Sequence, residues 1–330
     1  MENRQYKTAI IGAGTIGTAL GNILMEAGRE KILLHSIETH VVKDINESHI
    51  NSKYFPTLHL HPGLVATTDD SLLGNCKVIF LAIPSVAMIE YLNKLREHLP
   101  PDAILINLAK GFGCGNKTII ECLQEEFPNP VCTMKGPSFA REIINRLPTG
   151  FTLGYHDPDH IRLISELFVN TNVYLDYTDD IRGVEFLSIL KNIYAVALGI
   201  VDAQFNSPNL RFLILTKAFR EMRKVLVTSG GREDTLFKYC GYGDFTLTAL
   251  NDLSRNRTLG LLIGKGFFTE HVSHELVLEG KTAVNVFYEQ ISRNMNVEDD
   301  FPIIAELYHI FQNKYDISLF VNRILNFPEV

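Results

Sequence analysis

A glycine-rich turn near the N-terminus is the feature that most restricts how this chain can fold. Residues 8–11 are a short apolar run, and Gly12, Gly14 and Gly17 follow it as GxGxxG before the helical pattern TALGNILMEAG. In a strand, turn and helix of this kind, the first glycine permits the tight turn and the second lets a pyrophosphate approach. The third packs the helix on the strand. A plain glycine turn is the alternative, but this context favours a dinucleotide site at Gly12, Gly14 and Gly17.

Strand and helix patterns alternate through the first half of the chain. Further strands are predicted at residues 31–35, 77–83, 103–108, 131–134, 151–155 and 173–176, and helices at 39–47, 86–99, 118–127, 139–146 and 161–169. Such alternation predicts an α/β Rossmann-type doubly wound sheet. After Asp179 the strand patterns vanish, and 330 residues exceed the usual size of one core. We therefore expect a dinucleotide-binding domain at residues 1–179 and an all-helical substrate and catalytic domain at 180–330.

Glu38 indicates which dinucleotide the first domain prefers. It follows the second predicted strand, about 20 residues after Gly17, where an acidic side chain hydrogen-bonds the adenosine ribose hydroxyls. A carboxylate there repels a 2'-phosphate, and no arginine lies within this turn. The sequence therefore favours NAD, with NADP as the alternative. Glu38 as a simple cap of the helix at 39–47 is the competing interpretation.

Ligands of doubly wound sheets bind beyond the carboxyl ends of the strands. The residues at those ends here are Pro84-Ser85, Lys110-Gly111 and Gly136-Pro137-Ser138. Lys110 is the most informative because a cation directly after a buried strand is placed to meet an anionic ligand. An exposed loop lysine is the alternative.

The segment 184–203, VEFLSILKNIYAVALGIVDA, is an apolar helix with one cation inside it, Lys191, followed by Asn192. A helix that is apolar nearly all round should be buried, and burial disfavours the charged form of an ammonium. Lys191 is therefore a candidate acid/base catalyst. The alternative is a lysine whose ammonium reaches solvent from an ordinary core helix.

Two polar loops in the second half carry further candidates. Asp244 lies in a glycine-containing loop before Thr246 and Thr248, where it can orient Lys191. The segment 254–257, SRNR, brings two guanidinium groups and an amide together, which suits a phosphate. An exposed basic turn is the alternative. Lys191, Asp244 and Arg255 together suggest the reduction of a phosphorylated ketone.

The bulk properties exclude several other classes. The formal charge is −7 and the pI about 5.9, which argues against a nucleic-acid surface. The five cysteines are scattered without a CxxC pair or histidines at ligand spacing, so we expect free thiols and no metal site. The N-terminus has no signal-peptide pattern, and no uncharged run reaches membrane length. The expected location is the cytoplasm.

At this point the sequence resembles the bacterial-type NAD-dependent glycerol-3-phosphate dehydrogenases. The resemblance is carried, in order along nearly the whole chain, by IGAGTIGTAL, LAIPS, AKG, KGPSFAREI with LPT, GVE with LKN, GYGDFTLT, LSRNR and LEG. It implies that dihydroxyacetone phosphate and sn-glycerol 3-phosphate are interconverted for glycerophospholipid synthesis. It also implies a dimer or a monomer. The negative net charge predicts that the chain has no nucleic-acid partner.

The resemblance assigns roles to individual residues. Lys191 matches the proton donor and acceptor. Positions that contact or adjoin the substrate are Lys110, Gly136, Ser138, Asn192, Asp244, Thr248, Ser254, Arg255 and Asn256. Positions that touch the dinucleotide are Thr15, Ile16, Lys110, Ala140, Arg255 and Glu279, with Lys281 near a usual arginine.

Several positions depart from the family pattern. Leu187 and Ser188 replace two usual glycines, and the segment 203–209, AQFNSPN, lacks the glycines of the usual loop. Ile16 stands where an aromatic residue is commoner, and Ile37 where a basic residue is usual. Bulkier side chains at points of close approach can displace the cofactor or the substrate, and a displacement of about 1 Å lowers rates roughly 100-fold. The resemblance therefore does not imply the full catalytic rate of the family. A dehydrogenase for another small phosphorylated 2-hydroxy compound and a non-catalytic dinucleotide-binding protein are the two alternatives.

Overall fold

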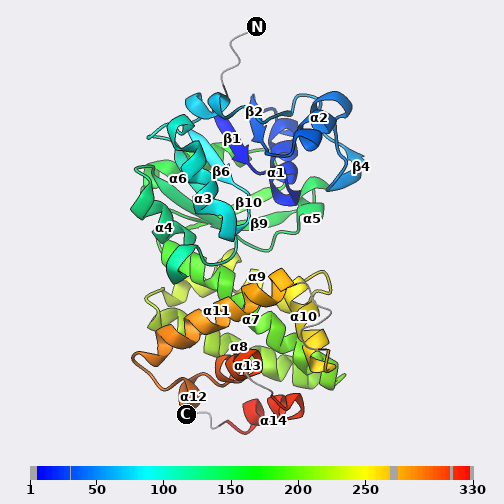
Figure 1. Cartoon of the computed structure of the whole chain (residues 1–330), viewed down its shortest axis with the longest axis vertical. Helices are drawn as coiled ribbons and strands as arrows, with labels where there is room; N and C mark the ends of the chain where they lie inside the picture. Colours follow the sequence, from blue (N-terminus) through cyan, green and yellow to red (C-terminus); the bar gives the residue numbers. More distant parts are fainter. Residues whose placement is uncertain (1–5, 30, 268–273, 313–314, 328–330) are drawn as a thin grey trace. The chain divides into compact units, whose positions relative to one another are not determined.

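The computed structural model describes residues 6–29, 31–267, 274–312 and 315–327 (Figure 1). The chain divides into two compact units, Met1–Glu185 and Phe186–Val330, and the boundary falls inside one long helix.

The first unit is built on an eight-stranded sheet (Figure 1). The strands are β1 (Thr8–Ile11), β2 (Ile32–His35), β5 (Val65–Thr67), β6 (Val78–Leu81), β7 (Ile104–Asn107), β8 (Val131–Lys135), β9 (Thr149–Gly154) and β10 (Val173–Thr178). Their order is β10-β9-β8-β7-β6-β1-β2-β5, and every pair is parallel except β8 with β9. The carboxyl ends of β1, β2, β6, β7 and β8 therefore lie along one edge.

Helices cover both faces of this sheet, which confirms the predicted doubly wound architecture. The helices are α1 (Thr15–Glu26), α2 (Thr39–Ser48), α3 (Ser85–Leu95), α4 (Ile119–Glu126), α5 (Ala140–Ile144) and α6 (Pro158–Phe168). Because side chains alternate along a strand, Ile10 of β1 joins the core beneath α1, α2, α5 and α6. Ile11 joins the core beneath α3 and α4.

Some elements were not predicted or run differently from the expectation. A two-stranded antiparallel hairpin, β3 (Ile50–Asn51) with β4 (Phe55–His59), and the short strand β5 were missed. The antiparallel direction of β9 was not expected either. Short 3-10 helices lie at Asp70–Asn75, Arg96–His98 and Cys114–Asn116.

The second unit is helical throughout its described residues. Its helices are α7 (Ile181–Gln204, which begins in the first unit), α8 (Pro208–Thr228), α9 (Asp244–Leu250), α10 (Arg255–Gly264), α11 (His274–Ser292), α12 (Val297–Asp300), α13 (Pro302–Gln312) and α14 (Phe320–Leu325). Short 3-10 turns at Glu233–Phe237 and Ile317–Leu319 and a π-helical turn at Tyr239–Gly243 complete it.

Helix α7 is the one described helix long and apolar enough to meet the length and composition criteria for a membrane span. Within the protein, 94% of its most apolar window is buried. Burial in the core accounts for this composition, as its sequence predicted.

Candidate functional site

The glycine turn between β1 and α1 has the geometry that its sequence predicts. Gly12 has a φ of 111°, and its N–H donates to the His35 carbonyl at 2.8 Å. A Cβ on Gly17 would lie 1.9 Å from the Gly12 carbonyl oxygen. A Cβ on Gly14 would meet no atom within 4 Å, so space remains open at the N-terminus of α1. The first and third glycines are required by the fold, and the second leaves room for a ligand.

Two buried polar side chains hold this turn in place. The Thr18 hydroxyl donates to the Ala13 carbonyl at 3.1 Å, and the Asn51 amide donates to the same carbonyl at 2.9 Å. Asn51 also donates to the Thr18 hydroxyl at 2.9 Å. Asn51 comes from β3, and no motif in the sequence marked it. The hairpin β3–β4 therefore supports the turn from outside the strand–turn–helix unit.

The residues around the turn fit a dinucleotide pyrophosphate. Thr15 is exposed at the first position of α1, and Ile16 is half-buried against the core of that face. Ala140 is half-buried at the start of α5, which packs on α1. The first turn of α1 contains no acidic residue, so its N–H groups and its dipole favour an anion.

Glu38 lies just beyond β2, in the cap position of α2, but its side chain does not cap that helix. It accepts hydrogen bonds from Lys53 at 2.5 Å and from the Tyr54 hydroxyl at 3.4 Å. The bond from Lys53 is the main cause that lowers the pKa of Glu38 below its usual value. Glu38 is therefore ionised at neutral pH and already has a cationic partner.

Three predicted substrate residues meet at the carboxyl ends of β7 and β8. The Lys110 ammonium donates to the Gly136 carbonyl at 3.4 Å, and the Ser138 hydroxyl donates to the same oxygen at 2.8 Å. A Cβ on Gly136 would lie 2.2 Å from the Gly150 carbonyl, so the backbone of β9 excludes any larger residue. Lys110, Gly136 and Ser138 thus form one cluster at the predicted edge.

A buried charged network that the sequence analysis missed lies beside this cluster. The Lys135 ammonium is 3.1 Å from the Glu185 carboxylate, and their side chains are 0% and 1% exposed. Lys135 also donates to the Asn107 carbonyl at 3.0 Å, and the Asn107 amide donates to Glu185 at 2.9 Å. Thr133 completes the network by donating to Glu185 at 2.5 Å. These contacts tie the ends of β7 and β8 to the first turns of α7.

Lys191 of α7 is buried and hydrogen-bonded. Its Nζ lies 2.5 Å from Asp244 Oδ1 and 3.1 Å from Thr248 Oγ1. The Thr248 hydroxyl in turn donates to the Asp244 carbonyl at 2.7 Å. The competing interpretation required the Lys191 ammonium to reach solvent, and it does not. Asn192, the next residue, is half-buried.

The segment 254–257 lies at the N-terminus of α10, and its two arginines differ. Ser254 caps α10 by accepting from the Arg257 N–H at 3.3 Å. Arg257 is buried and pairs with Asp202 at 2.8 Å, so it is structural. Arg255 is exposed, and Asn256 is half-buried. Of the two guanidinium groups, Arg255 is the one available to a ligand from solvent.

Close backbone contact fixes α10 against α7. A Cβ on Gly260 would lie 2.0 Å from the Val196 carbonyl, and one on Gly199 would lie 2.3 Å from the Arg257 carbonyl. Only glycine permits these approaches. They hold the Ser254–Arg257 segment in register with the helix that carries Lys191.

The remaining positions that the sequence singled out lie in α7, in α11 and between α7 and α8. Leu187 and Ser188 are buried in α7, and the segment 203–209 ends α7 and begins α8, with Ser207 as the cap. Lys281 is half-buried in α11. Glu279 lies in α11, but its side chain is outside the described residues.

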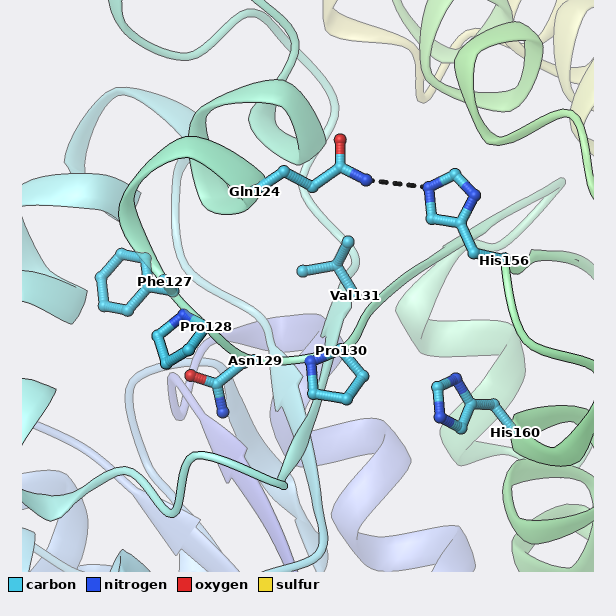
Figure 2. A pocket seen from close by; sticks show the side chains of 8 residues that line it. All are labelled: Gln124, Phe127, Pro128, Asn129, Pro130, Val131, His156 and His160. Carbon is cyan, nitrogen blue, oxygen red and sulfur yellow. Dashed lines mark hydrogen bonds between the residues drawn. The ribbon is translucent and has the colours of Figure 1, made fainter.

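A cavity of about 350 Å³ lies elsewhere in the first unit, at the amino end of β8 (Figure 2). Gln124 and His156, joined by a hydrogen bond of 2.8 Å, and His160 line it together with residues 127–131. The glycine turn follows the carboxyl end of β1, at the opposite end of the parallel strands, so the cavity is separate from the predicted dinucleotide site. Among the described residues no group of three His, Cys, Asp or Glu side chains could hold a metal ion.

Comparisons with known proteins match almost the whole chain to one family. Residues 7–161 match the family described as NAD-dependent glycerol-3-phosphate dehydrogenase N-terminus, and residues 180–322 match its C-terminus. A glycerol-3-phosphate dehydrogenase [NAD(P)+] of Methanothermobacter thermautotrophicus is 33% identical, covering 95% of this chain and 96% of the relative. One from Clostridium tetani is 34% identical, covering 96% and 90%.

Solved structures show the same fold. A glycerol-3-phosphate dehydrogenase from Coxiella burnetii matches with a TM-score of 0.87 and 26% identity, covering 98% of this chain and 99% of that one. A glycerol-3-phosphate dehydrogenase of Plasmodium falciparum, at 21% identity, matches in fold with a TM-score of 0.88 over 100% and 98% of the two chains.

Proposed function

Because this chain belongs to the NAD-dependent glycerol-3-phosphate dehydrogenase family, we propose that it reduces dihydroxyacetone phosphate to sn-glycerol 3-phosphate with NADH or NADPH. The product is a precursor of glycerophospholipids. The observation that carries the proposal is the buried Lys191, hydrogen-bonded to Asp244 and Thr248.

Lys191 is the proposed acid/base. Reduction of a ketone places negative charge on the carbonyl oxygen, and a positioned ammonium can donate its proton there as the charge develops. The Asp244 carboxylate accepts a hydrogen bond from the Lys191 ammonium and fixes its direction, and the Thr248 hydroxyl accepts a second hydrogen of the ammonium. The nicotinamide cofactor, when bound, supplies the hydride.

The remaining proposed contacts divide between the two units. In the first, the dinucleotide is bound by Gly12, Gly14, Thr15, Ile16, Gly17, Glu38 and Ala140, the substrate is contacted by Gly136 and Ser138, and Lys110 contacts both ligands. In the second, the substrate is contacted by Asn192, Asp244, Thr248, Ser254 and Asn256, the cofactor by Glu279 and Lys281, and Arg255 contacts both ligands. Arg255 at the N-terminus of α10 supports the phosphate site because a guanidinium and helix N–H groups both favour a phosphate.

NADH oxidation by the purified protein with dihydroxyacetone phosphate tests this function. Turnover, and its loss when the phosphate is replaced by a hydroxyl, is the expected result. Folded protein that turns over neither cofactor would contradict it. Tight NADH binding without turnover would favour a non-catalytic protein, and faster turnover of another phosphorylated 2-hydroxy compound would favour the related dehydrogenase.

A cytoplasmic location and a homodimer are part of the same proposal, with a monomer as the alternative that the resemblance leaves open. Fractionation of cells and sedimentation of the purified protein at several concentrations test them. A single species at the mass of the monomer would contradict the dimer.

A further inference from the structure

The hairpin β3–β4 brings a lysine against the acidic residue of the dinucleotide site. Asn51 in β3 donates to the Ala13 carbonyl of the glycine turn at 2.9 Å, which fixes the hairpin beside that turn. In the tight turn that follows, the Lys53 ammonium lies 2.5 Å from Glu38 Oε2. His40 Nε2 lies 3.8 Å from the same carboxylate. Groups that can carry positive charge therefore approach Glu38 from two elements.

The pair is ionised at neutral pH. The hydrogen bond with Glu38 is the main cause that raises the pKa of Lys53, and the same bond lowers the pKa of Glu38. The two charges cancel at close range. Glu38 alone would repel the 2'-phosphate of NADP, which is why the sequence favoured NAD. With Lys53 bound to it, that repulsion is offset.

We propose that Lys53 is a specificity-determining residue that lets this chain bind NADP(H) as well as NAD(H). Its ammonium turns to the 2'-phosphate of NADP(H), whereas the Glu38 carboxylate accepts hydrogen bonds from the ribose hydroxyls of NAD(H). The inference rests on the proposed function, because it requires a dinucleotide in the glycine turn.

Exposure makes this contact feasible. The Lys53 side chain is 46% exposed, so its ammonium can reach a ligand without opening the core. Ile37, where the family usually has a basic residue, is 73% exposed and apolar, so it offers a phosphate no charge. Lys53 lies in the hairpin that follows α2, so the residues directly after β2 do not reveal it.

Fluorescence titration of the purified full chain with NADH and NADPH tests the proposal. Lys53→Met should weaken NADPH binding roughly 10- to 100-fold, the value of a charge-assisted hydrogen bond, and leave NADH binding within about 3-fold. Lys53→Arg should retain NADPH binding because the charge remains. Lys43→Met removes an exposed lysine of α2, 69% exposed, and is the matched control that should change neither. Glu38→Gln should weaken NADH but not NADPH.

Four results would overturn the inference. Equal weakening of both cofactors by Lys53→Met would give Lys53 only a structural role in the hairpin. Unchanged NADPH binding in that variant would assign the 2'-phosphate to another residue. Wild-type protein that binds NADH but not NADPH would end the inference and leave the proposed function standing, whereas binding of neither would contradict both.

Discussion

The Nζ of Lys191 lies 2.5 Å from Oδ1 of Asp244, and the two side chains are only 4% and 1% exposed. Fifty-three positions separate them along the chain. Each charge of a buried ion pair has lost its hydration, and only a close contact with the opposite charge compensates for that loss. This contact fixes the direction of the Lys191 ammonium, which a proton donor requires.

Replacement of Lys191 by methionine should stop the chemistry but not cofactor binding. We expect kcat to fall roughly 100- to 10,000-fold, the usual contribution of a positioned acid/base. NADH affinity should stay close to the wild-type value, because the glycine turn is unchanged. Lys265→Met, at an exposed position after α10, is the control. A Lys191→Met protein that retains the wild-type rate would remove this residue from the mechanism.

Asp244→Asn keeps the shape of the side chain and removes its charge. The Lys191 ammonium would lose its buried carboxylate, so we expect a loss of about 3 kcal/mol in unfolding free energy, together with a lower kcat. Denaturant unfolding and steady-state kinetics measure the two effects. Asp234→Asn, at a carboxylate that is 65% exposed, should change neither by much. Equal behaviour of the two variants would show that Asp244 does not orient Lys191.

The glycine turn offers a test that separates folding from binding. Gly17→Ala would place a Cβ 1.9 Å from the Gly12 carbonyl, so it should both destabilise the protein and abolish NADH binding. Gly14→Ala places its Cβ in open space, at a backbone φ of −73° that alanine adopts readily. This variant should unfold like the wild type and bind NADH more weakly, because the methyl group enters the space left for the pyrophosphate. Unchanged NADH affinity in Gly14→Ala would place the cofactor elsewhere.

Local patterns predicted the parts of the fold that depend on short stretches of sequence. The glycine turn, the order of strands and helices and the burial of Lys191 all follow from periodicity and from the positions of glycines. The hairpin β3–β4 was missed because β4 is mostly exposed and contains Pro56, so it shows little apolar alternation. Asn51 and Lys53 were missed with it.

The direction of β9 could not be predicted from the alternation of strand and helix patterns alone, because that alternation suggests a parallel strand. The connection from β8 to β9 contains only α5, which has five residues. A helix of that length rises about 7.5 Å, too little to return along a strand. The chain therefore starts β9 near the edge where β8 ends, and β9 runs antiparallel to β8.

Lys135 shows the same limit for side chains. Lys135 and Glu185 stand in the KGPSFAREI and GVE motifs, but these motifs are distant in sequence and do not indicate that the two side chains pair. Lys135→Met removes the ammonium beside a buried carboxylate, and we expect a loss of about 3 kcal/mol in unfolding free energy. Lys117→Met breaks an exposed pair with Glu125 of 2.6 Å and should lose less than about 1 kcal/mol. Denaturant unfolding of both variants measures the contrast, and similar losses would contradict the structural role of the buried pair.

Glu221 of α8 gives a prediction about pH. Its carboxylate is buried beneath the N-terminus of α13, where it accepts from the N–H groups of Ile303 and Ile304 at 2.9 Å each. Burial raises its pKa to about 7 from a usual 4.5, and these hydrogen bonds oppose the shift only in part. Between pH 4.5 and 7 the Glu221 carboxyl group has released its proton in the unfolded chain but still holds it in the folded chain. The contribution of Glu221 to stability is therefore complete below pH 4.5 and falls as the pH rises to 7.

Glu221→Gln removes this titration while keeping one acceptor for the α13 N–H groups. Relative to wild type, its unfolding free energy should rise by roughly 3 kcal/mol between pH 4.5 and 7, because only the wild type has to ionise a buried carboxyl group. Urea unfolding at several pH values measures this difference, and other titrating groups cancel between the two proteins. If the difference stayed constant across that range, Glu221 would be ionised in the folded protein throughout, with the α13 N–H groups outweighing its burial.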